Sequence, residues 1–322
     1  MAKSEKGEQD SRGRHAKTPR QINLKGWRDI LLRVKNQIGE QSLSVIAAGV
    51  AFYGFLALFP AVAALISIYG IVITVEQVEQ QIRALTEILP EPAQVLIEQQ
   101  LSQIVAQSPT ALGWGMVISI LLGLWSANKG TKNLFKGLNI VYEEKKKRGF
   151  LKENAVSLLF TLFLIIIMII SMALIVVFPL VLNFLELPGW LHTLTAQLRW
   201  LLLAILVLFT LSTIYRFAPV RRSPKWKWVS WGAVFSTIVW LIGSALFSFY
   251  VSNFGAFNET YGSLGAVVVL LLWFLLTSFI VLIGGEINSE MEHQTIRDTT
   301  SGPEKRLGKR DAYDADDVGD IP

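Results

Sequence analysis

The charged and amide side chains that could do chemistry in this sequence lie close to the ends of long apolar runs. Asn128 and Lys129 follow one such run, and Glu286 follows another. Ionisable groups are costly inside a bilayer and tend to mark the paths of ions or substrates. Lys129 could bind an anionic head group, with the Asn128 amide adding a hydrogen bond. The sequence therefore predicts a substrate pathway that has Lys129 and Glu286, of opposite charge, at its mouth.

Other polar residues beside the last apolar run are weaker candidates for the same pathway. They are Asn253, Asn258 and Tyr261 before the run, and Asn288 and Glu290 after it. Each candidate also has an ordinary interpretation. Lys129 could anchor a helix at the membrane interface, Glu286 could lie among the lipid head groups, and the residues before the run could cap two helices. The sequence leaves these alternatives open.

Residues for enzyme chemistry are sparse. The histidines are His15, His192 and His293, which are far apart in the sequence, and the chain contains no cysteine. A metal-dependent nuclease needs clustered His and Asp ligands or paired carboxylates, and no apolar run contains an aspartate. The nucleotide-binding loop and the nucleophile elbow are absent as motifs. We predict no catalytic residues, no metal site and no cofactor.

The composition indicates the class of protein. The chain has 322 residues, of which 52% are hydrophobic and 17% charged, and its mean hydropathy is +0.45. A soluble domain of this size would cover one core with charge, whereas here the apolar residues gather in long uncharged runs. The predicted fold class is therefore an all-α polytopic membrane protein within residues 22–292.

Six apolar runs are candidates for transmembrane helices. They cover about 45–75, 112–127, 155–185, 198–217, 229–252 and 264–283. Pro60 should kink or divide the first. The second, at about 24 Å, is short for the hydrocarbon core, and glycine and polar residues follow it at 128–133. The third, at about 46 Å, must tilt or protrude.

Four segments lie outside these runs. Residues 1–21 are predicted to be a disordered basic tail, and residues 293–322 a disordered cytoplasmic tail. Residues 22–38 have the pattern of a basic amphipathic helix, lying either on the membrane or against the protein's own cytosolic side. The acidic segment 76–110 is predicted to form amphipathic helices outside the cytoplasm.

The loop charges predict the orientation of the chain. Basic residues flank the start of the first run and fill 145–152 and 216–227, whereas 76–110 is acidic and the two remaining loops are nearly uncharged. Cytoplasmic loops carry the excess of Lys and Arg. The alternation predicts six spans with both termini in the cytoplasm. Because topology already accounts for the basic clusters, we expect no nucleic acid partner.

Small residues in the fifth run predict close helix packing. Ser244, Ser248 and Ser252 are four residues apart and share one helix face, as do Gly232 and Ser236 nearer its start. Small residues let two membrane helices approach closely.

Several motifs together resemble a known family. They are A-F-Y-G-F-L-A-L-F-P at 51–60, G-L-N-I-V-Y at 137–142, Y-R-F-A-P at 215–219 and N-F-G-A-F-N-E-T-Y-G-S-L-G at 253–265. The chain resembles the YihY/BrkB family of bacterial inner-membrane proteins over about 24–292. The resemblance implies a six-span inner-membrane protein. Members have carried the label ribonuclease BN, a link to virulence and serum resistance, and a suggested role in envelope lipid transport; no site residue is transferred.

Three classes of function follow from these observations. The first is transport or flipping of a lipid-like or amphiphilic molecule in envelope maintenance. The alternative is a non-transporting scaffold that binds envelope partners through 76–110, and a ribonuclease is the least favoured. The expected partners are membrane lipids, with envelope proteins or a second copy of the chain as further candidates.

Overall fold

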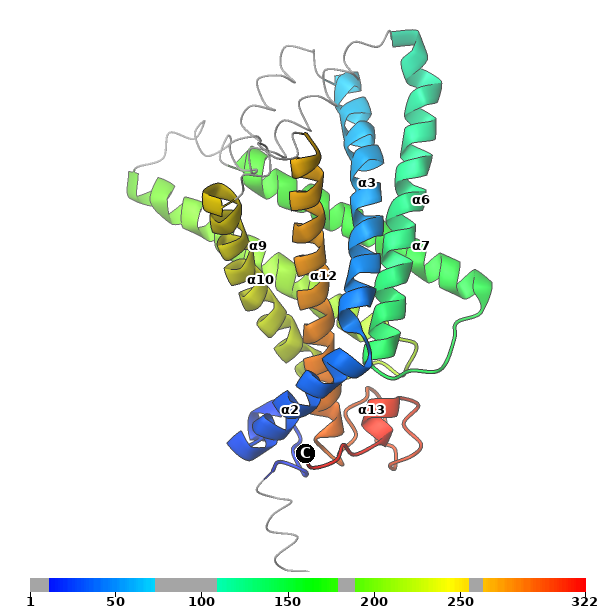
Figure 1. Cartoon of the computed structure of the whole chain (residues 1–322), viewed down its shortest axis with the longest axis vertical. Helices are drawn as coiled ribbons and strands as arrows, with labels where there is room; N and C mark the ends of the chain where they lie inside the picture. The colour runs from blue at the N-terminus through cyan, green and yellow to red at the C-terminus, as the bar shows by residue number, and fades with distance from the viewer. Residues whose placement is uncertain (1–11, 73–108, 179–188, 255–262) are drawn as a thin grey trace, which may run out of the picture. The chain divides into compact units, whose positions relative to one another are not determined.

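The computed structural model describes residues 12–72, 109–178, 189–254 and 263–322 (Figure 1). Within these ranges the chain is helical, and its only β-type pairing is an isolated bridge between Pro224 and Thr300. The longer helices are α2 (Leu24–Glu40), α3 (Leu43–Val72), α6 (Pro109–Val141), α7 (Phe150–Met172), α9 (Gly189–Phe217), α10 (Trp226–Phe254) and α12 (Ser263–His293). The shorter ones are η1 (Pro19–Gln21), η2 (Ala173–Val177), which continues α7 as a π-helix, and α13 (Tyr313–Asp316).

In the part of the chain that the structure describes, five helices are long and apolar enough to cross a membrane. Their candidate spans are Leu43–Pro60, Phe150–Val177, Gln197–Phe217, Trp226–Asn253 and Leu264–His293. The chain is thus a helical membrane protein, as predicted. The predicted second span lies in α6, which is not one of these five.

The predicted second span, at about 112–127, is part of the longer helix α6. This helix runs without a break from Pro109 to Val141, through Asn128, Lys129 and Gly130. A Cβ at Gly130 would lie 3.7 Å from atoms of Tyr53 and Gly54 in α3. That is an ordinary van der Waals distance, so α6 lies against α3 at Gly130, and the glycine does not end the helix.

Helix α3 is also a single element, although Pro60 lies inside it. A Cβ at Gly123 of α6 would lie 2.9 Å from the Pro60 ring. α3 thus has a second close contact with a glycine of α6.

The chain divides into two compact units. The first contains residues 1–47, 134–240 and 279–322, and the second contains 48–133 and 241–278. In the first unit, Ile30 and Val34 of α2 form a buried cluster with Trp228 of α10 and with Ile287 and Met291 of α12. Of the two alternatives for the amphipathic helix, this cluster supports packing against the protein itself.

Helices α10 and α12 pack closely in the first unit. A Cβ at Gly232 would collide with the carbonyl oxygen of Gly284, and the Gly232 N–H donates a 2.8 Å hydrogen bond to Asn288 Oδ1. Ser236 is buried and donates to the Ile280 carbonyl at 3.1 Å. Gly232 and Ser236, one of the predicted small-residue pairs, therefore lie at a helix contact.

The C-terminal segment differs from its prediction. The polarity of residues 293–322 predicts disorder, but Thr295, Thr299 and Asp314 are fully buried. The Lys225 N–H donates to the Thr299 carbonyl at 2.9 Å, and the Ser301 N–H donates to the Ser223 carbonyl at 2.9 Å. The segment is ordered because its polar groups have partners far away in the sequence.

The basic N-terminal tail is predicted to be disordered over 1–21, but from residue 12 onward it is also ordered by contacts with distant residues. The Ile296 N–H donates to the Arg14 carbonyl at 2.9 Å, and the Thr295 hydroxyl donates to the Ala16 carbonyl at 2.8 Å. Residues 1–11 lie outside the described residues, as does nearly all of the predicted extracytoplasmic segment 76–110.

Candidate functional site

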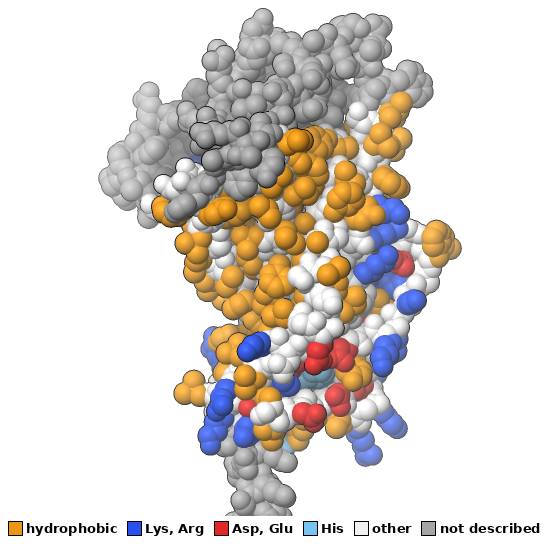
Figure 2. Space-filling model, viewed as in Figure 1, with side chains coloured by type: hydrophobic (Ala, Val, Ile, Leu, Met, Phe, Trp, Pro, Cys, Tyr) orange, Lys and Arg blue, Asp and Glu red, His pale blue; other side chains and the backbone are white. Residues whose placement is uncertain are grey.

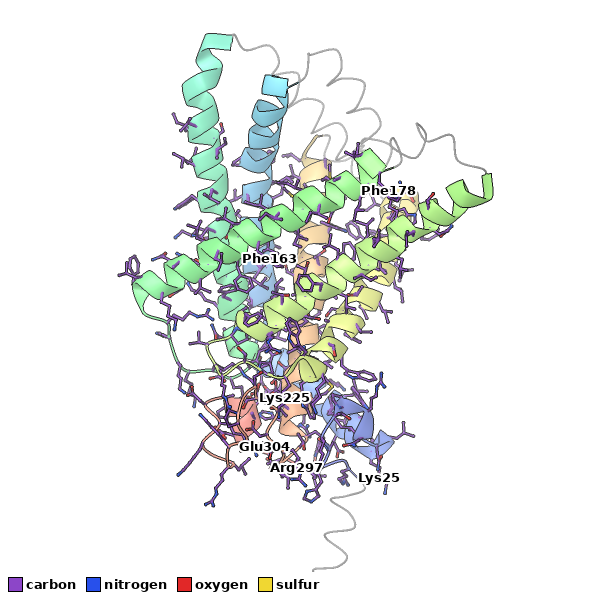
Figure 3. The ribbon with its side chains drawn as sticks, turned by 180° about the vertical axis from the view of Figure 1, so that it is seen from behind. Lys25, Phe163, Phe178, Lys225, Arg297 and Glu304 are labelled. Carbon is purple, nitrogen blue, oxygen red and sulfur yellow. The ribbon has the colours of Figure 1, made fainter. Side chains whose placement is uncertain are left out.

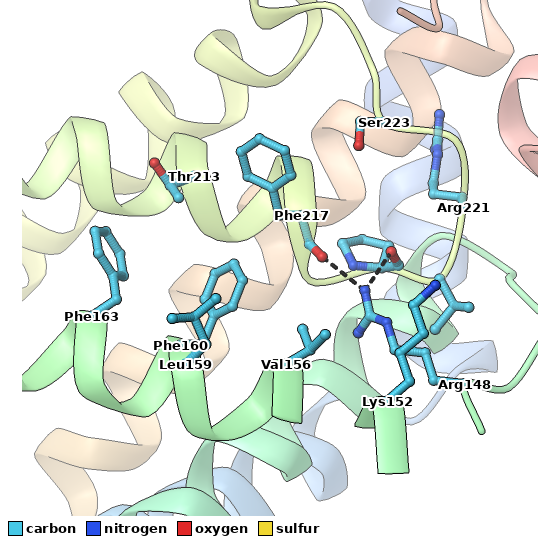
Figure 4. A pocket seen from close by; sticks show the side chains of 12 residues that line it. Arg148, Lys152, Val156, Leu159, Phe160, Phe163, Thr213, Phe217, Arg221 and Ser223 are labelled. Atoms are coloured by element: carbon cyan, nitrogen blue, oxygen red, sulfur yellow. Dashed lines mark hydrogen bonds between the residues drawn. The ribbon is translucent and has the colours of Figure 1, made fainter. Parts of the chain in front are cut away.

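A groove of about 690 Å³ lies between α7, α9 and the loop that follows α9 (Figure 4). α7 and α9 run side by side (Figures 1 and 3). The lining residues are Arg148, Lys152, Val156, Leu159, Phe160, Phe163, Thr213, Phe217, Pro219, Val220, Arg221 and Ser223. The groove therefore combines an apolar wall with basic side chains, and none of its lining residues is acidic.

The apolar wall follows from helical spacing. Lys152, Val156, Leu159 and Phe163 recur at intervals of three or four residues, which places them on one face of α7. Aromatic contacts continue the wall, because the Phe163 ring lies 6.3 Å from that of Phe209 in α9. These residues belong to the candidate spans Phe150–Val177 and Gln197–Phe217. The wall thus belongs to two candidate membrane spans.

Arg148 lies at the basic end of the groove. Its guanidinium donates hydrogen bonds to the carbonyl oxygens of Phe217 at 2.9 Å, Ala218 at 3.0 Å and Pro219 at 3.3 Å. These carbonyls close the C-terminal end of α9, where a cation is favourable. Burial lowers the pKa of Arg148, which still carries its positive charge at neutral pH. Arg148 therefore holds α9 to the start of α7 and keeps a cation at the groove.

Lys152, one turn further along α7, is exposed, and it forms no hydrogen bond or ion pair within the described part of the chain. Arg148 and Lys152 thus place two cations at one end of the groove, and only Arg148 is engaged.

Arg221 lines the other side of the groove, but its charge is compensated from behind. Its side chain is fully buried and pairs with Glu292 at 2.6 Å and with Asp314 at 3.2 Å. It also lies over the Tyr142 ring, 5.0 Å from the centroid. Burial opposes its charge, but Glu292 and Asp314 outweigh burial and raise the pKa of Arg221.

Arg221 belongs to a buried ionic cluster, which we define as Arg33, Arg221, Glu290, Glu292, His293 and Asp314. Arg33 Nε donates to Glu290 Oε2 at 2.5 Å, and His293 Nε2 lies 3.4 Å from Asp314 Oδ1. Burial raises the pKa of Asp314 to about 7, although His293 and Arg221 oppose the shift. Figure 2 shows acidic, basic and histidine side chains gathered around α2 and the C-terminal segment.

The predicted pathway residues have different environments. Glu286 is 1% exposed, and its Oε2 has no hydrogen-bond partner among the described residues. Asn288 and Glu290 are buried and engaged by the chain itself, since Asn288 bonds Gly232 and Val229 of α10, and Glu290 bonds Arg33 of α2. Lys129 is exposed, and its ammonium lies 5.5 Å from the centroid of the Trp125 ring.

The other predicted residues are placed as follows. Asn128 is half-buried on α6, and Asn253 is exposed and donates to the Phe249 carbonyl of its own helix at 2.9 Å. Asn258 and Tyr261 lie outside the described residues. Ser244 is half-buried on α10, whereas Ser248 and Ser252 are exposed, so the partner of this serine face stays a prediction.

No sequence motif predicts the groove. Arg148 and Lys152 belong to the basic cluster at 145–152, which predicts the orientation of the chain. The available signal was the run of positions 148, 152, 156, 159 and 163, which carries two cations and then three apolar residues along one helix face.

The long apolar helices define a multi-pass helical membrane protein. The family described as virulence factor BrkB matches residues 34–308, and the chain belongs to this family. Relatives described as UPF0761 membrane proteins are consistent with the same class. One from Haemophilus influenzae is 22% identical over 268 residues, covering 80% of this chain and 92% of the relative.

Two further relatives cover most of the chain. A UPF0761 membrane protein of Pseudoalteromonas translucida is 24% identical over 294 residues, covering 89% of this chain and 91% of the relative. The protein YfkH of Bacillus subtilis, described as ribonuclease-like, is 29% identical over 248 residues, covering 76% of this chain and 88% of the relative. No solved structure matches the chain.

A metal-dependent nuclease would need a ligand set. Among the described residues, no group of three or more His, Cys, Asp or Glu side chains is placed to hold a metal ion.

Proposed function

We propose that the chain is a six-span protein of the bacterial inner membrane that moves or flips a lipid-like or amphiphilic molecule in envelope maintenance. The sixth span is the first part of α6, and both termini lie in the cytoplasm. The basic residues that join α6 to α7 and α9 to α10 support this orientation. Reporter fusions after Gln99 and after Arg222 test it, because they should report opposite compartments; the same compartment for both would overturn the topology.

The observation that carries the proposed movement of an amphiphile is the groove between α7 and α9. An apolar wall with polar groups at one end matches the two parts of an amphiphile, and about 690 Å³ lies in the usual range of ligand sites. In the proposed orientation its basic end lies at the cytoplasmic side of the membrane, where a lipid of the inner leaflet has its head group.

Lys129 and Glu286 complete the proposal as polar groups at the cytoplasmic mouth of the pathway. Buried polar atoms in proteins nearly always have hydrogen-bond partners. The unpartnered Oε2 of Glu286 therefore supports a role in binding an ion or a polar group of the substrate.

The energy source is constrained by the sequence, which lacks a nucleotide-binding loop motif. Movement of substrate against a gradient would draw on an ion gradient or another protein, whereas downhill flipping needs neither. The chain itself is proposed to act without catalysis and without a cofactor.

The test is transport by purified protein in liposomes that carry labelled lipids of several head groups. Wild type is compared with Lys129→Ala, Glu286→Gln and the apolar control Leu271→Ile. We expect wild type and the control to move at least one lipid faster than protein-free liposomes, and both charge variants to be slower. Unchanged rates in both charge variants would retain transport and remove Lys129 and Glu286 from the pathway.

Two other outcomes distinguish the alternatives. Wild type no faster than empty liposomes for every head group would overturn the transport proposal in favour of a scaffold that binds envelope proteins or a second copy of itself. The name of the Bacillus relative makes RNA hydrolysis the remaining candidate. Cleavage of RNA by the purified wild type would contradict the proposal of a non-enzymatic protein.

A further inference from the structure

The basic end of the groove and its apolar wall have the dimensions of a lipid in one leaflet. Lys152 and Phe163 are eleven positions apart on α7, which is about 17 Å along the helix. The hydrocarbon core of a bilayer is about 30 Å thick, so one leaflet contributes about 15 Å, and because this span must tilt, the depth from Lys152 to Phe163 is less than the length along the helix and fits within one leaflet. A head group at Lys152 would therefore leave an acyl chain beside Val156, Leu159 and Phe163.

From these features we infer that the groove binds an anionic phospholipid, with its phosphate at Lys152 and Arg148 and one acyl chain along the α7 wall. That this lipid is also the molecule that the protein moves rests on the proposed function. Binding itself is a separate property and can be tested alone.

The charge of the groove selects an anion. Lys152 has no ion-pair partner in the described residues, and every hydrogen bond found for Arg148 goes to a backbone carbonyl. Arg221 adds little net charge because Glu292 and Asp314 contact it from behind. The two remaining cations face a lining without carboxylates; Glu153 acts electrostatically on Arg148 but does not line the groove. A phosphate there would gain charge-assisted hydrogen bonds.

The apolar wall selects a lipid over a soluble anion. Val156, Leu159 and Phe163 lie in a candidate membrane span, and Leu159 is 66% exposed. A free phosphate would leave this wall uncovered, whereas an acyl chain would cover it. The volume of about 690 Å³ holds the head-group region and part of one chain; the second chain would stay in the bilayer.

The experiment measures lipid binding to the purified full-length chain in detergent by native mass spectrometry. Phosphatidylglycerol is the anionic probe, phosphatidylcholine the zwitterionic probe, and inorganic phosphate the soluble competitor. The key variant is Lys152→Gln. Its matched control is Lys147→Gln, which removes the same charge from an exposed residue that does not line the groove.

We expect wild type to retain phosphatidylglycerol several-fold more tightly than phosphatidylcholine. A basic residue near an anionic surface contributes enough for about a fivefold change. Lys152→Gln should therefore weaken phosphatidylglycerol binding about fivefold, and Lys147→Gln less than twofold. A further variant is Arg148→Lys, which keeps the cation but cannot form the same fork of hydrogen bonds. Its melting temperature is measured as well, because Arg148 also holds the end of α9.

Equal loss in Lys152→Gln and Lys147→Gln would overturn the site. Equal retention of the two lipids would overturn its preference for an anion, and full displacement by millimolar phosphate would identify a soluble anion in place of a lipid. Tight, Lys152-dependent binding without any lipid movement in liposomes would keep this inference and reject the proposed function. Lipid movement without Lys152-dependent binding would reject this inference and keep the proposed function.

Discussion

Arg221 and Lys152 are cations that line the same groove, yet their surroundings differ. Arg221 is buried against Glu292 and Asp314, and it connects the loop after α9 to α12 and the C-terminal segment. Lys152 is exposed on α7 and has no acidic partner in the described residues. The comparison indicates that Arg221, whose charge is compensated by carboxylates, stabilises the fold, whereas Lys152, whose charge is not, is available to a ligand.

The largest expected effect is the loss of the buried cation. Arg221→Met would leave Glu292 and Asp314 buried without their shared partner, and removing one member of a buried ion pair costs about 3–5 kcal/mol. We expect a comparable loss in the free energy of unfolding, measured by denaturation in detergent. Arg20→Met, which removes an exposed cation, should change stability by less than about 0.5 kcal/mol. Similar losses in the two variants would contradict the role assigned to the buried ionic cluster.

The next effect tests the helix contact that supports the cluster. Gly232→Ala would place a methyl group against the carbonyl oxygen of Gly284, and overpacking of this kind costs about 1–3 kcal/mol. The matched control is Gly39→Ala in α2, where a Cβ has no neighbour within 4 Å. This substitution should stabilise the helix by up to about 1 kcal/mol. A stabilised Gly232→Ala variant would show that α10 and α12 are not in close contact.

The third prediction concerns pH. Burial raises the pKa of Asp314 from 3.8 to about 7, while His293 and Arg221 oppose the shift and Glu292 adds to it. A raised carboxyl pKa means that the folded chain keeps a proton that the unfolded chain releases. This contribution to stability is therefore fully present below about pH 4 and is lost as the pH rises through 7.

Asp314→Asn, which cannot titrate, should therefore depend less on pH than wild type. Between pH 5.5 and 7, the free energy of unfolding of wild type should fall by about 2 kcal/mol more than that of Asp314→Asn. Parallel slopes would show that Asp314 is already ionised at pH 5.5 and is fully compensated by Arg221.

The smallest expected effect is at the groove itself. Lys152→Met removes a cation as Arg221→Met does, but no buried partner loses its counter-charge. The free energy of unfolding should therefore change by less than about 0.5 kcal/mol. A loss above 2 kcal/mol would mean that Lys152 holds the fold, and the contrast with Arg221 would fail.

The sequence was sufficient to predict a helical membrane protein with several long apolar helices. The length needed to cross a bilayer is a local property of the chain, so the runs near 198–217 and 229–252 agree with the spans Gln197–Phe217 and Trp226–Asn253. Helix ends were less predictable. α12 continues to His293, past the predicted end at 283, because its polar residues Asn288 and Glu290 are bonded by α10 and α2.

The groove and the buried ionic cluster could not be predicted because both depend on contacts between distant residues. Arg221 and Asp314 are 93 positions apart, and the polarity of the C-terminal segment alone indicated disorder. Lys152 and Arg148 were correctly recognised as basic, but only the adjacency of α7 and α9 shows that they share a groove with apolar residues.

Whether the uncompensated cation of the groove handles the lipid is tested by the rate at which labelled phosphatidylglycerol crosses the membrane of liposomes containing wild type, Lys152→Gln or Lys147→Gln. We expect wild type and Lys147→Gln to be equally fast, and Lys152→Gln to be several-fold slower while melting at the same temperature as wild type. A Lys152→Gln variant as fast as wild type would contradict the claim that the uncompensated cation of the groove handles the lipid.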